Sequence, residues 1–164
     1  MKILGIDPGA SGAFAFFDTI AGTLELLDMP TVQVIRNGKK RNEISEQMIA
    51  AVIGARPPVV AVIERVYAMP GQGVTSMFSM GKGSGLWEGI ITALGMPLVR
   101  IPPQRWKKEM LADGRGKDKQ ASIVRALELF PEAASHMARK KDEGRAEAIL
   151  IAEYLRRTND YDGA

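Results

Sequence analysis

Two short apolar segments, each ending in a carboxylate, constrain the fold of this chain most strongly. Residues 2–7 read KILGID, and residues 57–65 read PPVVAVIER. The second segment is almost wholly apolar, and a strand of that kind is buried on both faces, as in the core of a parallel sheet. Asp7 and Glu64 stand where the two apolar runs end. Because an unpaired buried charge is costly, both acids require an explanation.

The rest of the pattern predicts an α/β fold. Further strands are expected at 12–18, 23–29 and 96–101, and the turn at 21–22 makes the first three strands an antiparallel meander. Apolar spacing predicts helices over 44–56, from within 66–85 to about 94, from 102, and over 118–130 and 143–157. Asn37-Gly38 signals a turn, and Asn42 is the expected cap of the first helix. We therefore expect a mixed central sheet, antiparallel in its first three strands and then parallel, flanked by helices.

Composition indicates one globular domain over residues 1–157, with a frayed tail over 158–164. The 164 residues are 46% hydrophobic and 25% charged, as is usual for soluble proteins. The chain has no cysteine, which excludes disulfides and thiolate zinc sites, and its one histidine, His136, cannot build a histidine metal centre alone. No apolar run approaches the ~18 residues of a membrane span, and the N-terminus has no signal-peptide pattern. A cytoplasmic protein without a membrane partner is expected.

Positive charge is concentrated in three places. The net charge is only +3, yet basic residues gather within 104–119, 36–41 and 139–141. Basic clusters on loops and helix starts suit contacts with phosphates. A solvated basic face would give the same pattern, and charge alone does not decide between the two.

The acids form a second pattern. Ligands gather at strand ends in an open α/β sheet, where Asp7 and Glu64 stand. The final helix opens with Asp142, Glu143 and Glu147, of which the last two share one face. Such carboxylates suit Mg²⁺ or Mn²⁺, and two ions ~3.5–4 Å apart can hydrolyse a phosphodiester. Each acid also has an ordinary interpretation: a turn residue, a partner for Arg65, a helix-capping charge or a solvated side chain.

Together these segments resemble one family, the RuvC-type Holliday junction resolvases, and especially their phage and prophage branch. The resemblance rests on the following stretches: ILGIDPGASGAFAFF, VVAVIERVYAMPGQGVTSMFSMGKGSGLWEGI, IPPQRWKKEML, DKQAS and DEGRAEAILIAEY. It covers roughly residues 1–157. It implies an RNase H-like fold, a homodimer, and nicking of branched DNA that depends on two Mg²⁺ ions per site, with Mn²⁺ able to substitute. No nucleotide cofactor is expected.

The resemblance also assigns metal ligands. Asp7 matches the ligand on the first strand, Glu64 the ligand on the central strand, and Glu147 the acid of the last helix. Cellular resolvases carry a further acid or histidine three residues before the helix acid, where this chain has Gly144. Asp142 or Glu143 must substitute, and helix geometry favours Glu143. The expected catalytic set is thus Asp7, Glu64, Glu143 and Glu147, and Asp142 is a further candidate ligand.

A DNA-binding set accompanies the acids. Lys107 and Lys119 match basic positions near the scissile phosphate, and Phe78 lies where the family places an aromatic wedge, although it could equally pack in the core. The glycine-rich segment around Gly73 would let the backbone approach phosphates, and the neighbouring cations would bind them. The expected DNA-binding residues are Gly73, Phe78, Lys82, Arg105, Lys107, Lys108, Lys117 and Lys119.

Two other classes remain open at this point. A non-catalytic protein of the same fold could bind branched DNA without cutting it. The actin-like and sugar-kinase ATPases also begin with a GIDxG strand, but 164 residues are too few for the two duplicated domains of that fold.

Overall fold

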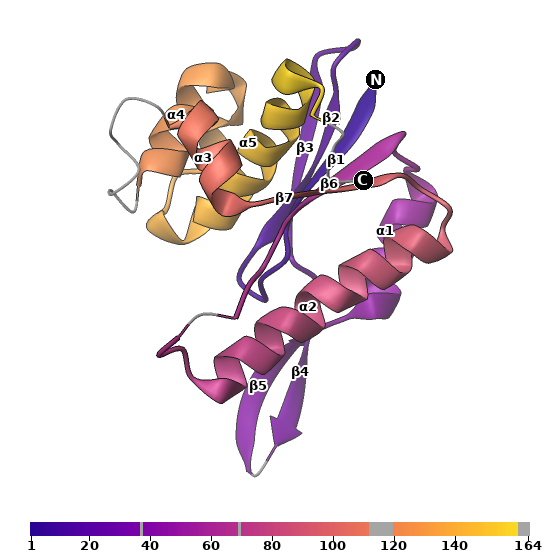
Figure 1. Ribbon diagram of the computed structural model, residues 1–164, viewed down its shortest axis with the longest axis vertical. Helices are drawn as coiled ribbons and strands as arrows, with labels where there is room; N and C mark the ends of the chain where they lie inside the picture. The colour runs from indigo at the N-terminus through magenta and orange to yellow at the C-terminus, as the bar shows by residue number, and fades with distance from the viewer. Residues whose placement is uncertain (37, 69, 112–119, 161–164) are drawn as a thin grey trace.

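The computed structural model describes residues 1–36, 38–68, 70–111 and 120–160. Its centre is a five-stranded sheet in the order β3-β2-β1-β6-β7 (Figure 1). The strands are β1 (Lys2–Asp7), β2 (Ala13–Asp18), β3 (Thr23–Asp28), β6 (Val60–Glu64) and β7 (Leu98–Ile101). β1, β2 and β3 pair antiparallel, whereas β1, β6 and β7 run parallel. The predicted mixed sheet is confirmed.

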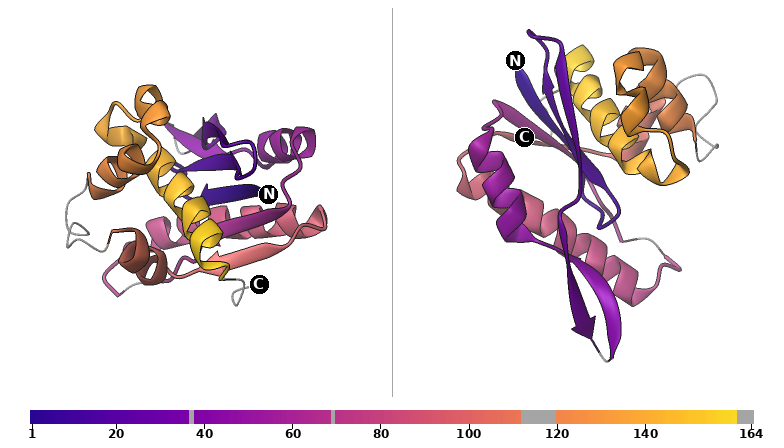
Figure 2. Two further views of the ribbon diagram at one scale, coloured as in Figure 1. Left: turned by 90° about the horizontal axis from the view of Figure 1, so that it is seen from above. Right: turned by 180° about the vertical axis from the view of Figure 1, so that it is seen from behind.

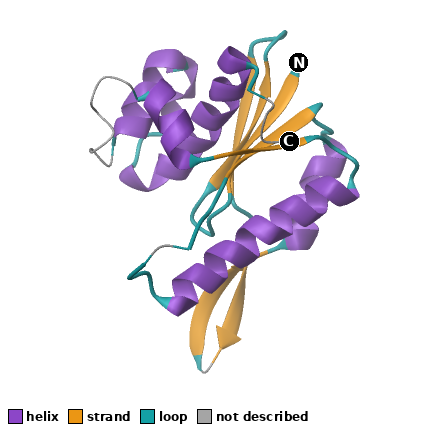
Figure 3. Cartoon of the chain, viewed as in Figure 1, coloured by secondary structure: helices purple, strands orange, loops and turns teal. Residues whose placement is uncertain are grey.

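Helices cover both faces of this sheet (Figures 1 and 3). On one face lie α3 (Pro103–Met110), α4 (Ala121–Leu129) and α5 (Glu143–Thr158), joined by short 3₁₀ helices over Pro131–His136 and Lys140–Asp142. On the other lie α1 (Glu46–Ala55) and α2 (Val74–Ala93). Each face has its own apolar core. Burial of these two cores holds the strand ends in fixed positions.

The closest helix–sheet contact is that of α5 with β1. A side chain added at Gly5 would place its Cβ 2.1 Å from the carbonyl oxygen of Ala148 and 2.9 Å from Cβ of Ala152. Only glycine on the strand and alanine on the helix permit such an approach. The contact brings the first turns of α5 over the end of β1, where Asp7 lies.

The sequence signalled a hairpin-type turn at Asn37-Gly38, but it did not predict the two strands on either side, which form a hairpin separate from the main sheet. The hairpin consists of β4 (Thr31–Arg36) and β5 (Lys39–Ile44), and it projects beyond the sheet beside α2 (Figure 2). The prediction that Asn42 caps α1 is wrong, because Asn42 lies within β5. Ser45 is the cap, and its hydroxyl accepts a bond from the Met48 amide at 3.4 Å.

The helix predicted to start within 66–85 begins at Val74 and ends at Ala93, so Gly81, Gly83 and Gly85 lie inside α2. The expected start of the C-terminal tail differs from the structure. The prediction of a frayed tail from residue 158 is wrong at its start. α5 includes Thr158, and the carboxylate of Asp160 accepts a 2.7 Å bond from the Tyr154 hydroxyl. Residues 161–164 lie outside the described residues.

Candidate active site

Three carboxylates converge at the carboxyl end of β1. β1 and β6 pair in parallel with Ile6 opposite Ile63, so Asp7 and Glu64 follow at neighbouring strand ends. Glu147 lies on the α5 segment that packs over them. Burial, and then the negative charges of Glu147 and Glu64, raise the pKa of Asp7 to about 7. This shift shows that the three acids share one electrostatic environment.

Two glycines, Gly12 and Gly144, leave room for the Asp7 carboxylate and for the close approach of α5. A Cβ at Gly12 would lie 2.3 Å from the Asp7 carbonyl oxygen and 2.9 Å from its carboxylate. A Cβ at Gly144 would lie 2.9 Å from Cα of Gly12. The turn after β1 therefore packs directly against the first turn of α5. A side chain, acidic or not, has no room at position 144 in this packing.

Glu64 is oriented by a buried indole that the sequence analysis did not identify. Nε1 of Trp106 donates to Oε2 of Glu64 at 2.7 Å, and Trp106 is fully buried in the first turn of α3. Burial raises the pKa of Glu64, and this bond partly opposes the rise. Trp106 lies between Arg105 and Lys107 in the motif PPQRWKK, and that position was the available signal.

Glu147 is held by one cation and one hydroxyl. Nζ of Lys107 lies 2.9 Å from its Oε1, and the Ser122 hydroxyl donates to the same oxygen at 3.3 Å. Nζ of Lys107 also lies 5.0 Å from the centre of the Trp106 ring, within range of a cation–π contact. Although burial opposes it, the charges of Glu147, Glu64 and Glu143 raise the pKa of Lys107. Lys107 therefore belongs to the acidic centre itself, and Ser122 is a second contributor that the sequence analysis did not identify.

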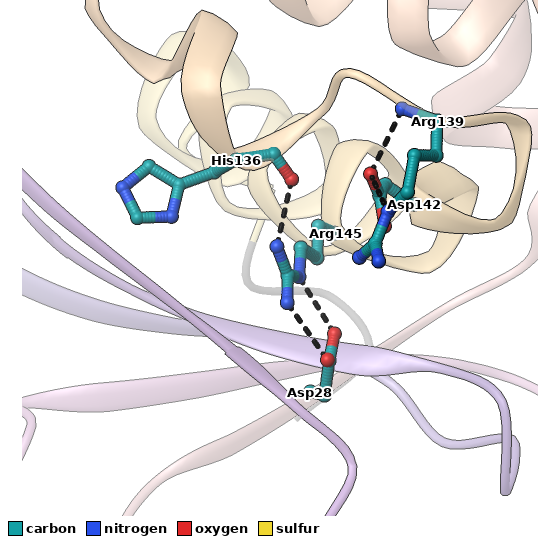
Figure 4. A network of polar contacts seen from close by, with 5 residues as sticks. All are labelled: Asp28, His136, Arg139, Asp142 and Arg145. Carbon is teal, nitrogen blue, oxygen red and sulfur yellow. Dashed lines mark hydrogen bonds and ion pairs between the residues drawn. The ribbon is translucent and has the colours of Figure 1, made fainter.

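The two candidates for the fourth acid have different surroundings. Asp142 is buried, accepts a 2.9 Å bond from the Arg139 amide and a 2.7 Å bond from its guanidinium, and its pKa is lowered chiefly by that side chain (Figure 4). Glu143 instead contributes to the field at Lys107. Glu143 is therefore near enough for its charge to act on Lys107, whereas Asp142 is bound to Arg139.

An ion-pair network fixes the beginning of α5 beside this centre. Arg145 donates two bonds to Asp28 at the end of β3, at 2.6 and 2.7 Å, and one to the carbonyl oxygen of His136 at 2.8 Å (Figure 4). The helix is therefore tied to the sheet and to the preceding 3₁₀ helix. His136 takes part in this network through its backbone carbonyl oxygen.

The carboxylates of this centre suit a hard divalent cation, although their side chains are not arranged as a complete coordination site. Clustered carboxylates with mutual repulsion are the ligands that Mg²⁺ and Mn²⁺ prefer. As positioned, no three acidic or histidine side chains within the described residues form a group that could hold one ion. Because the Lys107 ammonium bonds directly to Glu147, a small rearrangement of these two side chains would be needed for that acid to act as a ligand.

The predicted DNA-binding residues fall into two groups. Arg105, Lys107 and Lys108 lie on α3. Of these, Lys107 contacts Glu147, and Arg105 forms a 3.0 Å ion pair with Asp160. The second group, around the first half of α2, comprises Gly73, Phe78 and Lys82. Phe78 is 72% exposed, so the alternative that it packs in the core is wrong. Lys117 and Lys119 lie outside the described residues.

No family model matches the sequence. A search of curated proteins finds similarity to a chloroplast protein of Chlamydomonas reinhardtii described as Holliday junction resolvase MOC1. The two are 32% identical over a region that covers 64% of this chain and 13% of the relative. The chain thus corresponds to a small part of that relative's length.

Solved structures match over nearly the whole chain. RuvC of T. thermophilus in complex with a Holliday junction substrate has a TM-score of 0.63 at 13% identity, covering 96% of this chain and 95% of that one. The yeast mitochondrial Holliday junction resolvase Ydc2 has a TM-score of 0.58 at 15% identity, with coverage of 94% and 78%. The Fowlpox virus resolvase bound to Holliday junction DNA gives 0.52 at 14% identity, with coverage of 98% and 99%.

Sheet order and helix placement define an α/β domain, and the carboxylates at the ends of β1 and β6 give it an acidic centre. Within that class, the chain has the fold of the RuvC-type resolvases. Its predicted place in the phage branch stays a prediction.

Proposed function

We propose that this domain is a structure-selective endonuclease that nicks four-way and related branched DNA by metal-dependent hydrolysis of a phosphodiester. The observation that carries the proposal is the convergence of Asp7, Glu64 and Glu147 from two strand ends and one helix. The similarity to a chloroplast Holliday junction resolvase supports the same substrate class.

Asp7, Glu64, Glu143 and Glu147 would hold Mg²⁺ or Mn²⁺, two ions in each site. Bound there, the ions would supply Lewis-acid stabilisation of the phosphate and an activated water. The chain's own residues keep the acids in place: Trp106 fixes one oxygen of Glu64, and Gly12 and Gly144 let α5 approach Asp7. Lys107, released from Glu147, would bind the phosphate beside the bond that breaks.

Several cations would hold the DNA outside the acidic centre. Arg105 and Lys108 lie on the same helix as Lys107, and Lys117 and Lys119 follow in sequence. Contacts of this kind give affinity without sequence preference. The exposed ring of Phe78 suits insertion between bases at the branch point, where stacking is already interrupted.

We further propose that the nuclease acts as a homodimer through α2. A four-way junction has approximate two-fold symmetry, and its resolution requires nicks on two opposed strands. Gly81, Gly85 and Gly89 recur at four-residue intervals on the exposed side of α2, and no atom lies within 4 Å of a Cβ added at any of them. Trp87 contributes to the core and not to this surface, because it is fully buried against Phe14 and Met29.

Incubation with a synthetic four-way junction and Mg²⁺ tests the proposed activity. An endonuclease yields nicked arms that can be ligated again. A non-catalytic binding protein would shift the junction in a gel and leave it intact, and an ATPase of the actin-like class would do neither. Either of the last two results would refute the proposal.

A further inference from the structure

The most prominent feature that the acidic centre leaves unexplained is the β4–β5 hairpin. Both strands are largely exposed, and Val32 and Ile35 are 45% and 73% exposed. An isolated two-stranded hairpin is only marginally stable in water. This one projects from the body of the domain beside α2 (Figures 1 and 2). An exposed ribbon of this kind is suited to contact another molecule.

The hairpin and α2 enclose a groove of about 520 Å³. Its lining combines hairpin residues, the first half of α2 and one residue of the turn after β1. Ala10, three residues after Asp7 in the turn that follows β1, is one of the lining residues. A Cβ at Gly83 would lie 2.8 Å from the Pro8 carbonyl oxygen and 3.0 Å from Cδ1 of Ile44, so α2 packs directly against this turn and against the end of the hairpin. The groove and the acidic centre therefore share the turn after β1.

The charges in the groove favour an anion. Arg36, Arg41 and Lys82 line it together with a single acid, Glu43, which gives a net charge of +2. Glu43 accepts two bonds from the Arg36 guanidinium, one of them 3.1 Å long, and lies 3.6 Å from Nζ of Lys82. Glu43 thus forms ion pairs with both Arg36 and Lys82 and keeps them at the groove. Arg41 is exposed and makes no ion pair with an acid among the described residues.

Neutral groups in the groove fit the same kind of ligand. Thr75 and Ser79 line the groove with hydroxyls, which donate readily to phosphate oxygens. α2 begins beside them, with Gly73 as an N-cap that has no side chain to satisfy the first amides of the helix. The amides at a helix N-terminus attract phosphates.

We propose that the groove between the β4–β5 hairpin and α2 binds the sugar-phosphate backbone of a DNA strand as it leaves the acidic centre. This inference rests on the proposed function and adds a second DNA-contacting surface to it. Strands of six residues extend about 20 Å. The groove would therefore cover about six nucleotides on one side of the branch point.

The direct test is junction affinity of the double variant Arg41→Gln/Lys82→Gln, measured by fluorescence anisotropy in EDTA at several salt concentrations. The matched control, Lys2→Gln/Arg56→Gln, removes the same charges from exposed positions away from the groove. We expect the groove variant to bind at least tenfold more weakly at low salt, and its plot of log affinity against log salt to be shallower by about two. The control should match the wild type.

A second variant separates the inference from a folding defect. Glu43→Gln removes the one acid of the groove and releases Arg36 and Lys82 from their ion pairs. It should bind the junction more tightly than the wild type, which a damaged hairpin cannot do. Unchanged or weaker binding by Glu43→Gln would overturn the inference.

Hydroxyl-radical footprinting locates the contact. The wild type should protect about six nucleotides beside the branch, and Arg41→Gln/Lys82→Gln should lose that protection while retaining protection at the branch itself. Binding by this variant equal to that of the wild type would overturn the groove and leave the nuclease proposal intact. Failure of the wild type to bind a junction at all would refute both.

Discussion

At the scale of single residues, Asp7 is the most informative side chain. Its carboxylate is partly buried, and its pKa is raised to about 7 by burial and by the charges of Glu147 and Glu64. In the unfolded chain the same group ionises near its ordinary value of 3.8. Ionised Asp7 therefore destabilises the folded state. This cost is fully present above about pH 7 and is lost as the pH falls toward 4.

The first prediction follows from this destabilisation of the folded state by ionised Asp7. In metal-free buffer at pH 8, Asp7→Asn should unfold at a higher temperature than the wild type. The gain should be about 1–2 kcal/mol, since partial exposure reduces the effect below that of a fully buried acid. The difference should shrink as the pH falls toward 4, because the folded wild type is then protonated and the pH approaches the unfolded-state pKa of 3.8. Equal melting temperatures at pH 8 in EDTA would contradict the assigned charge repulsion.

The second prediction concerns Trp106, which we regard as a positioning residue for Glu64. Trp106→Phe removes the indole donor and keeps most of the buried ring. A hydrogen bond to a charged group is worth about 1.5–3 kcal/mol, so the cleavage rate should fall by about tenfold or more while junction affinity is kept. The measurement is single-turnover cleavage of a labelled junction with saturating protein.

Trp87→Phe is the matched control for Trp106. Trp87 is equally buried, and its indole donates to the Met29 sulfur at 3.3 Å, on the opposite face of the sheet. This variant should lose stability without a selective loss of cleavage. A similar loss of cleavage rate in both variants would show that Trp106 acts only through packing.

At the scale of elements, the contact between α5 and the end of β1 determines whether the acids meet. Gly144→Ala would place a Cβ 2.9–3.0 Å from the backbone of Gly12, where no flexible side chain can yield. We predict that α5 shifts and that the variant loses both stability and most cleavage.

Gly54→Ala is the control, because Gly54 lies inside α1 with nothing within 4 Å of an added Cβ. It should gain up to about 1 kcal/mol from helix propensity. Full activity of Gly144→Ala would contradict this account.

The sequence predicted the main sheet because its central strands are buried on both faces and therefore form continuous apolar runs. It signalled the turn at Asn37-Gly38 but did not predict the β4–β5 strands. Neither face of that hairpin is fully buried, the alternation that starts at Thr31 stops at Ile35, and β5 has no alternation. The helix over Gly81–Gly85 contradicts local propensity. It forms because Gly83 packs against the Pro8 carbonyl oxygen and because Trp87 and Ile91 enter the core one and two turns later.

The candidate site, like the fold, was predicted only in part. Strand ends and the last helix identified Asp7, Glu64 and Glu147, because their backbone positions follow from the element pattern. The pairings of Trp106 with Glu64 and of Ser122 with Glu147 span 42 and 25 residues. Such contacts depend on how α3 and α4 pack against the sheet, which local periodicity does not specify. Helix geometry already favoured Glu143 over Asp142 as the fourth ligand, but the ion pair between Asp142 and Arg139 was not predicted.

At the scale of the whole molecule, the proposed dimer makes a prediction about mass. Light scattering at micromolar concentration should give about twice the chain mass of 17.8 kDa. Gly85→Glu would introduce a charge on the open glycine surface of α2, where an added Cβ meets nothing in the chain itself. It should give a folded monomer with an unchanged circular dichroism spectrum. A wild-type monomer, both free and on junction DNA, would refute the dimer.

The central claim is that the acidic centre cuts DNA that other residues bind. Its most direct test compares cleavage and binding of one four-way junction by Asp7→Asn, Glu64→Gln and Glu147→Gln, with cleavage measured in Mg²⁺ and affinity in EDTA. Loss of a negative charge does not weaken contacts with phosphates. We therefore predict that all three variants bind the junction at least as tightly as the wild type and that each loses cleavage by at least about 100-fold. Cleavage at the wild-type rate by all three amide variants would contradict the account.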